Sequence, residues 1–287
     1  MEKIRNNIKS VFIATFLGSA ALIWYLVFYF EARQNLLFTV FDVGQGDAIF
    51  LELGGKQILI DGGPDEKILS KLGRRMPFWD RYIDLLILTH PHADHLTGLL
   101  EVVKRYDVGM ILETKVNYTT PEYEEWRRLL KKKNINIVVA QAGQVVRMAP
   151  NAYVDILAPR ENFAGGSPGN VHDAMIVAKL HFGASSALLT GDAEKITEYK
   201  LVFFEGARLG SDILKVGHHG SKTSTTEDFL RTVSPKIAII SSGRKNRYGH
   251  PHQEVIDRLK DFGVHVLRTD EKGDIKMKSD GVKVFYE

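Results

Sequence analysis

Four residues that can bind metal ions fall within six positions, directly after an apolar segment. Ile83–Leu88 is apolar apart from one aspartate and predicts a strand, and the sequence HPHADH follows one residue later. We expect a tight turn at the strand end to bring His90 and His92 onto one cation, with Asp94 and His95 turned towards a neighbouring position. Because the chain has no cysteine, any metal must be held by histidine and carboxylate, ligands that zinc, manganese and iron share.

The rest of the hydrophobic pattern predicts strands and helices in a single domain. Apolar runs bounded by turn residues predict strands at Leu36–Phe41, Ala48–Leu53, Gln57–Ile60, Ile135–Ala140, Tyr153–Leu157, Met175–His181, Ala187–Leu189, Ile213–Val216 and Lys236–Ile240. Helical spacing or charge patterning predicts helices at Leu96–Tyr106, Glu122–Lys133, Ala193–Phe203, Glu227–Thr232 and Gln253–Phe262. Residues 36–287 therefore fit one domain of layered α/β structure.

Composition excludes several classes of protein. With 44% hydrophobic and 25% charged residues, the chain is neither disordered nor collagen-like. The 38 Lys and Arg exceed the 35 Asp and Glu by only three, so net charge alone gives no argument for nucleic-acid binding. Such an argument must come from local clusters of charge.

An apolar run near the start of the chain predicts a membrane anchor. Residues 11–30 contain no charge, and 20 helical residues span a hydrocarbon core of about 30 Å. A cleaved signal peptide and a buried core helix are the alternatives. Trp24, Tyr25 and Tyr29 suit the membrane interface at the end of the run.

The flanking charges predict the orientation of this helix. Lys3, Arg5 and Lys9 precede the run, whereas only Arg33 follows it closely. The excess of positive charge on the cytoplasmic side would leave residues 1–10 in the cytoplasm and the domain outside the cell membrane.

Further motifs resemble one enzyme family. HPHADH after a hydrophobic strand, IDGG at 60–63, LTGD at 189–192 and LKVGHHGS at 214–221 together resemble the metallo-β-lactamase superfamily. DVGQGD at 42–47, the HHGS segment and YGHPH at 248–252 resemble more specifically the extracellular hydrolase domain of ComEC-type DNA-uptake channels.

The resemblance implies a four-layer αββα sandwich with two divalent metal ions, zinc or manganese, at one edge of the sheets. His90, His92 and a third histidine would bind the first ion, Asp94, His95 and a late histidine the second, and Asp192 both. Asp61 would accept the second ring N–H of a ligand and so fix its tautomer. It could equally be a turn residue before two glycines.

Two ligand assignments stay open at this point. His172 precedes Asp192 by 20 residues, as in many hydrolases of the superfamily, but relatives of the uptake-channel type have a different pattern here. His172 is therefore either the third ligand or a loop residue beside the cleft. Of the adjacent pair His218 and His219, we favour His218 as the ligand and His219 as a contact to the substrate or leaving group.

A basic loop predicts contact with phosphate or nucleic acid. Residues 242–252 contain three cations and two histidines just before a helix, a natural site for an anion, although a solvated basic loop is the alternative. Substrate contacts are predicted for Ser221, Lys222, Arg244, Lys245, Arg247 and His252. His250 could protonate the leaving oxygen.

The resulting hypothesis is a membrane-anchored, divalent-metal-dependent phosphodiesterase or nuclease, with Asp94, His219 and His250 in catalytic roles and nucleic acid as substrate. Hydrolysis of a β-lactam, a thioester or a cell-wall phosphoester is an alternative, because the same metals serve all these reactions. A non-catalytic DNA-binding component of an uptake apparatus is the other.

Overall fold

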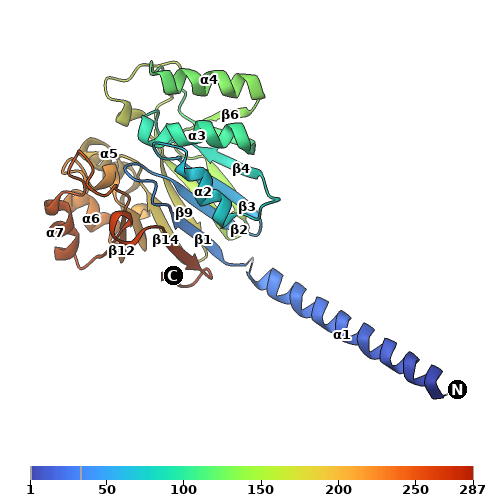
Figure 1. Ribbon diagram of the computed structural model, residues 1–287. Coiled ribbons are helices and arrows are strands. Elements are labelled where there is room, and N and C mark those ends of the chain that lie inside the picture. Colours follow the sequence, from blue (N-terminus) through green and yellow to red (C-terminus); the bar gives the residue numbers. More distant parts are fainter. Residues whose placement is uncertain (1, 33, 287) are drawn as a thin grey trace.

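Two β-sheets pack face to face, with helices on both outer faces (Figure 1). The computed structural model describes residues 2–32 and 34–286, with only some side chains of the first helix. One hydrophobic cluster lies between the sheets. A second lies between the first sheet and its helices, and a third between the second sheet and its helices. The predicted layered α/β sandwich is confirmed.

The first sheet, within the described residues, has eight strands in the order β15-β14-β1-β2-β3-β4-β5-β6. These are β1 Leu36–Val40, β2 Ile49–Leu53, β3 Lys56–Ile60, β4 Tyr82–Ile87, β5 Asp107–Glu113, β6 Asn136–Val139, β14 Ile275–Ser279 and β15 Val284–Tyr286. Neighbours from β3 to β6 are parallel, and the other pairs are antiparallel.

The second sheet has seven described strands in the order β13-β12-β11-β10-β9-β8-β7. These are β7 Val145–Ala149, β8 Ala152–Ala158, β9 Val177–Phe182, β10 Ser185–Leu189, β11 Ile213–Lys215, β12 Ile237–Ile240 and β13 His265–Arg268. Strands β10 to β13 are parallel, so their carboxyl ends lie at one edge.

Amphipathic helices cover the outer faces. The first sheet is covered by α2 Lys67–Arg75, α3 Ala93–Arg105 and α4 Pro121–Lys133, and the second by α5 Lys195–Glu205, α6 Glu227–Val233 and α7 Gln253–Asp261. The short elements are α8 Thr269–Lys272, η1 Val171–Ala174, η2 Gly206–Leu209 and η3 Gly217–Gly220. Fully buried Trp126 of α4 and Phe229 of α6 illustrate these two outer clusters.

The first helix, α1 Glu2–Ala32, extends away from the sheets (Figure 1). Its described apolar side chains include Phe12 and Phe16, each 73% exposed. Among the described residues, no helix combines the length and apolar character needed to cross a membrane, so the predicted transmembrane segment is not confirmed. The side chains of Lys3, Arg5 and Tyr29 and the whole of Arg33, used to predict orientation and interface, lie outside the described residues.

Helix α3 begins at Ala93, three residues before the predicted start, because His92 has extended backbone angles and acts as the N-cap. Asp94 and His95 therefore lie in the first helical turn. The helix packs closely on the loop after β3, where Gly62 N–H donates to the His95 carbonyl (2.8 Å). A Cβ atom on Gly98 would lie 1.9 Å from the Gly62 carbonyl oxygen. Glycine is thus required where α3 meets this loop.

We expect Gly98→Ala to lower the free energy of unfolding by about 1–3 kcal/mol, because overpacking would push α3 from the sheet. The matched control is Gly73→Ala in α2, where an added Cβ would meet nothing within 4 Å. That change should stabilise the protein by about 0.5–1 kcal/mol. Urea denaturation measures both, and wild-type stability of Gly98→Ala would contradict the close packing.

Candidate metal centre

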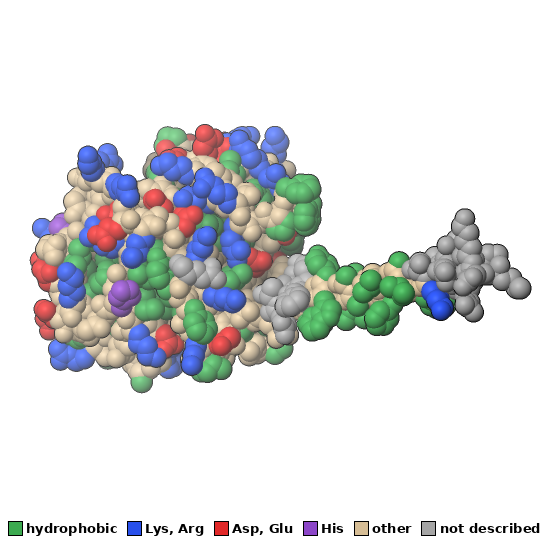
Figure 2. All heavy atoms as spheres, turned by 60° about the horizontal axis from the view of Figure 1, so that its bottom comes forward, with side chains coloured by type: hydrophobic (Ala, Val, Ile, Leu, Met, Phe, Trp, Pro, Cys, Tyr) green, Lys and Arg blue, Asp and Glu red, His purple; other side chains and the backbone are tan. Residues whose placement is uncertain are grey.

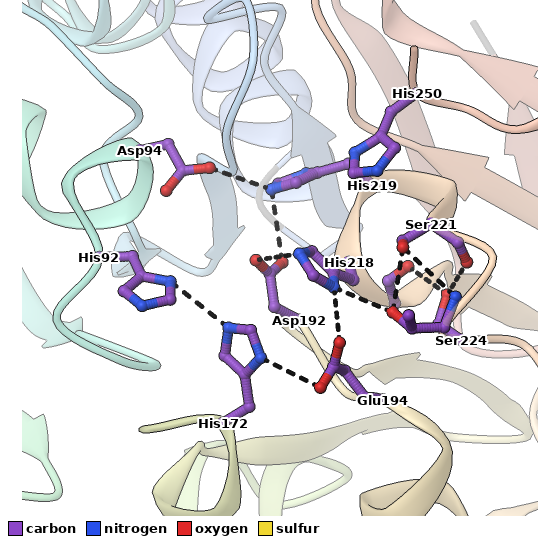
Figure 3. A network of polar contacts seen from close by, with 12 residues as sticks. His92, Asp94, His172, Asp192, Glu194, His218, His219, Ser221, Ser224 and His250 are labelled. Carbon is purple, nitrogen blue, oxygen red and sulfur yellow. Dashed lines mark hydrogen bonds and ion pairs between the residues drawn. The ribbon is translucent and has the colours of Figure 1, made fainter. Parts of the chain in front are cut away.

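Loops that follow β4, β10 and β11 bring imidazoles and carboxylates together at one edge of the sandwich (Figure 3). The ends of β4 and β10 lead to His90 and Asp192, and the end of β11 leads to His218 and His219. Strand ends are rigid platforms, so side chains from distant parts of the sequence meet in fixed positions. Among the described residues four groups of ligand-competent atoms result, and two of them share Asp192.

The first group contains His90, His92, His172 and Asp192. His90 Nε2 lies 3.0 Å from His92 Nδ1, and His172 Nε2 lies 3.4 Å from the same His92 atom. His90 and His172 are buried. Burial lowers the pKa of His90 well below its usual range and that of His92 to about 4, so both rings are held neutral, as metal ligands require.

The second group contains Asp94, His95, Asp192 and His219. His95 Nε2 lies 3.3 Å from Asp192 Oδ2, and His219 Nε2 lies 3.4 Å from both Asp192 Oδ1 and Asp94 Oδ2. Burial alone would lower the pKa of His95 and of His219. The charge of Asp192, with Asp61 at His95 and Asp47 at His219, raises both pKa values well above the usual range.

The carboxylate of Asp61, outside the two groups, determines which ring nitrogen His95 turns towards the cluster. Asp61 accepts hydrogen bonds from the Thr89 N–H (2.8 Å) and hydroxyl (2.7 Å), and it lies 2.8 Å from His95 Nδ1. His95 Nδ1 therefore carries the proton and Nε2 faces the cluster. The Thr89 hydroxyl lies 3.1 Å from His90 Nδ1 and links that ring to the same carboxylate.

Glu194, which the sequence reasoning did not single out, orients two more rings. Its carboxylate oxygens lie 3.5 Å from His172 Nδ1 and 3.3 Å from His218 Nδ1. His172 Nε2 is thereby left to face His92 (Figure 3). The signal available was its position two residues after Asp192, at the N-cap of α5.

Asp47 and Lys215 form a second missed feature, a fully buried ion pair at 2.8 Å behind His219. His219 Nδ1 lies 2.9 Å from the Ser241 carbonyl and 3.4 Å from Asp47 Oδ1. Although burial opposes ionisation, Lys215 and His219 lower the pKa of Asp47 to about 2. The signal was the last residue of DVGQGD, a motif noted for its resemblance without a role for this aspartate.

The structure places the two adjacent histidines in different groups, His219 with Asp94, His95 and Asp192, and His218 with His172 and Glu194. His219 is buried and its Nε2 joins the second group, whereas His218 Nε2 lies 4.0 Å from Asp192 Oδ2 and its side chain is 25% exposed. Both residues have left-handed backbone angles (φ 46° and 54°). Because this conformation turns the chain sharply, the second ring points into the cluster and the first towards Glu194 and Thr223.

The residues present fit divalent cations. Nε2 of His95 and of His219 and Oδ1 of Asp192 are buried and have no hydrogen-bond partner among the described residues. Thr89 and Glu194 face Nδ1 of His90 and of His172, so the Nε2 atoms of these two rings face His92 and are available to a cation. Imidazole and carboxylate are suitable donors for zinc or manganese.

The predicted substrate residues surround this cluster with different exposures. The centre of the His250 ring lies 5.6 Å from that of the His218 ring and 5.0 Å from that of the His252 ring. Burial, with His219 and His218, lowers the pKa of His250 to about 4. Lys222, Arg244, Lys245 and Arg247 are exposed. Ser221 is buried, and its hydroxyl lies 3.0 Å from that of Thr223 rather than facing solvent.

Comparison with known proteins now identifies the family. The sequence pattern of the metallo-beta-lactamase superfamily matches residues 41–244, which include both groups of candidate ligands. The chain belongs to this superfamily. The fold implies divalent metal ions, in agreement with the clustered donors.

The chain is also similar to competence proteins. It is 32% identical to ComE operon protein 3 of Bacillus subtilis (83% of this chain, 32% of that protein) and 30% identical to competence protein ComA of Neisseria gonorrhoeae (82% and 31%). It thus spans about a third of these relatives' length. The metallo hydrolase Igni18 of Ignicoccus hospitalis shares the fold, with TM-score 0.54 and 16% identity over 84% of this chain and 98% of that one. The resemblance inferred from the motifs is confirmed, and the protein is a metallo-beta-lactamase superfamily hydrolase related to competence proteins.

The two adjacent histidines give a matched test of the centre. We expect His219→Ala to weaken zinc or manganese binding at the second group by more than about 100-fold, since even losing an outer partner of a ligand costs about 10–100-fold. His218→Ala should retain both the stoichiometry and most of the affinity. Calorimetric titration and elemental analysis measure the difference. Selective metal loss in His218→Ala would favour His218 as the ligand and His219 as the contact to the substrate.

Proposed function

We propose that this protein is a metal-dependent phosphodiesterase that cleaves DNA. The observation that carries the proposal is a basic loop beside the ligand cluster. Arg247 is exposed, and His250 of the same loop has its ring 5.6 Å from that of His218. A phosphate backbone held by this loop would lie next to the two groups of ligands.

In this proposal two ions bind, one to each group. His90, His92, His172 and Asp192 would hold the first, and Asp94, His95, Asp192 and His219 would hold the second. Such ions supply Lewis-acid activation of water and neutralise charge on the phosphodiester. Asp61, Glu194 and Asp47 hold the histidine rings in the required tautomers and orientations.

The remaining residues act on the substrate. His218 is partly exposed and points its Nε2 towards Asp192, so it is placed to contact the substrate or leaving group. His250 belongs to the basic loop, and its ring lies 5.6 Å from that of His218, where it could donate a hydrogen bond to the leaving oxygen. Its Nδ1 lies 3.4 Å from the Gln45 amide nitrogen, so Nε2 is the atom available for that step.

The loop is shaped to present its cations outward. Asn246 ties it together, accepting from the Tyr248 N–H (3.1 Å) and the His250 N–H (3.0 Å) and donating to the Gly243 carbonyl (2.8 Å). Arg244 donates to the Asp270 carbonyl (2.6 Å), which leaves its positive charge uncompensated by a described ion pair. Cations on a fixed loop favour a polyanionic backbone and carry no sequence preference.

Replacing Arg244, Lys245 and Arg247 by Ala should weaken cleavage of DNA and leave hydrolysis of bis-p-nitrophenyl phosphate nearly intact, because the metal ligands are untouched. Each lost phosphate contact should also reduce the salt dependence of DNA binding by about one unit of log–log slope. Steady-state kinetics with both substrates and binding titrations over a range of salt measure these effects.

The matched control replaces Lys131, Lys132 and Lys133 of α4, which are also exposed, and should leave DNA cleavage unchanged. His92→Ala should abolish both activities. If the triple loop variant lost activity on DNA and on the small diester equally, the loop would be part of the catalytic scaffold. Wild-type hydrolysis of the small diester without any DNA cleavage would favour a different phosphoester or another substrate of the superfamily.

We propose separately that α1 attaches the domain to the cell membrane, with the domain on the extracytoplasmic side. The support is the uncharged run at residues 11–30 and the exposure of Phe12, Phe16 and Trp24 (73%, 73% and 62%). Exposed apolar side chains along most of a helix require an apolar environment. The nucleic-acid proposal does not depend on this attachment.

Carbonate washing tests the attachment. The full chain should remain in the membrane pellet, whereas residues 36–287 expressed alone should be recovered without detergent, because the apolar run is absent from them. Protease added to intact spheroplasts should digest the domain. Release of the full chain by carbonate would contradict the anchor, and complete protection from protease would contradict its orientation.

A further inference from the structure

A basic hollow lies on the outer face of the first sheet, and none of the candidate metal ligands lines it. Its volume is about 300 Å³, and four cationic side chains line it together with residues of β1. They are Arg74 and Arg75 at the end of α2 and Lys276 and Lys278 of β14. No described carboxylate lines the hollow. Figure 2 shows Lys and Arg side chains spread over one face of the domain, interspersed with acidic and hydrophobic side chains.

Strand alternation explains why these lysines face outward. Met277 between them is 2% exposed and packs between the two sheets, so Lys276 and Lys278 point to the opposite face. Lys278 pairs with Leu37 on one side and with Phe285 on the other, which puts apolar and cationic side chains on one surface. Lys276 is exposed and Lys278 partly exposed, and the end of α2 borders this surface through Arg74 and Arg75.

Two large aromatic side chains project beside the hollow, on the loop that joins α2 to β4. Phe78 is 81% exposed and Trp79 is 73% exposed, and their rings contact each other edge to face at 4.8 Å. Only Met76 and Pro77 separate them from Arg75 at the hollow. Two adjacent exposed aromatics next to a basic surface are typical of segments that enter the interface of a bilayer.

The position of α1 places the same surface near its end. Leu37 lines the hollow and lies five residues after Ala32, where α1 ends, so the chain between them spans at most about 18 Å. Arg75 is paired with Glu52 (2.9 Å), but Arg74, Lys276 and Lys278 form no ion pair with a described residue. Their charge is available to an anionic partner.

We propose that this surface binds the headgroups of anionic lipids while Phe78 and Trp79 enter the bilayer interface, so that the domain lies against the membrane. The inference rests on the proposed attachment of α1 for its orientation. Lipid phosphates are attracted by cations within a Debye length of the surface. The aromatic pair adds an apolar contact that a soluble anion would not use.

The absence of cysteine from the sequence allows a site-specific test on the full chain. Phe78→Cys is labelled with an environment-sensitive fluorophore and reconstituted into vesicles of phosphatidylcholine alone or of equal parts phosphatidylcholine and phosphatidylglycerol. We expect a blue shift of the emission and loss of quenching by soluble iodide with the anionic vesicles only. Phe203→Cys on α5 is the matched control, because Phe203 is also 81% exposed, and it should show neither change.

Charge substitutions separate docking from anchoring. Arg74→Gln, Lys276→Gln and Lys278→Gln together should abolish the shift at position 78, whereas Lys131→Gln, Lys132→Gln and Lys133→Gln on α4 should not. Circular dichroism and hydrolysis of the small diester verify that each variant is folded. Flotation with phosphatidylcholine vesicles reports attachment by α1 independently of lipid charge.

Three results would overturn the docking proposal: no shift with either vesicle, an equal shift with both, or an unchanged shift in the triple variant. If the chain floats with neutral vesicles but shows any of these results, α1 anchors the chain and the proposed surface does not bind lipid headgroups. If the shift occurs with anionic vesicles although the chain does not float with neutral ones, docking holds and the anchor fails.

Discussion

One buried carboxylate determines how the two halves of the centre are built. Asp192 is 2% exposed, and its oxygens lie 3.3 Å from His95 Nε2, 3.4 Å from His219 Nε2 and 3.7 Å from His90 Nε2. Burial opposes its ionisation, yet His219 and His95 hold its pKa well below the usual range. A buried negative charge of this kind is stable only with positive partners, whether protons on the rings or metal ions. Because it belongs to both groups, neither group is complete without it.

The surrounding backbone is arranged to keep these side chains in place. Asp61, His218 and His219 all have positive φ (57°, 46° and 54°), a conformation that costs free energy for residues other than glycine. Such strain persists where neighbouring contacts over-determine it. Asp61 is held by Thr89 and His95, and His219 by the Ser241 carbonyl. The contacts of the centre thus hold three residues in strained backbone conformations.

Contacts between the two sheets link these loops. The Ser241 hydroxyl donates to the Gly46 carbonyl (2.6 Å), which joins the loop after β12 to the loop between β1 and β2. A Cβ atom on Gly46 would lie 2.1 Å from the Asp94 carbonyl oxygen, so this loop touches the start of α3 directly. Asp94 is thus fixed by a segment almost 50 residues earlier in the chain. The DVGQGD motif acts as a connection between the sheets as well as the source of Asp47.

How far the sequence predicts such a centre depends on the range of the contact involved. Strand patterning and the spacing of HPHADH depend on neighbouring residues, and they predicted the layers and brought together His90, His92, Asp94 and His95. Helix α2 was not predicted, because its nine residues follow a turn and only Ile68 and Leu72 are buried. The order of His218 and His219 depends on two left-handed residues and on Asp47 from the other sheet, contacts that no local pattern contains.

Strand direction relates the two surfaces of the domain. Strands β1, β3 and β4 run the same way, since β1 and β3 are both antiparallel to β2 and β4 is parallel to β3. β4 begins at Tyr82 beside the aromatic loop and leads to His90, eight residues or about 26 Å further on. β1 likewise begins next to α1 and leads to the loop that contacts Asp94. The ends of these strands that lie beside α1 and the aromatic loop are therefore opposite to the ends that carry the metal ligands, so a large polyanion can approach the ligands without meeting α1 or the aromatic loop.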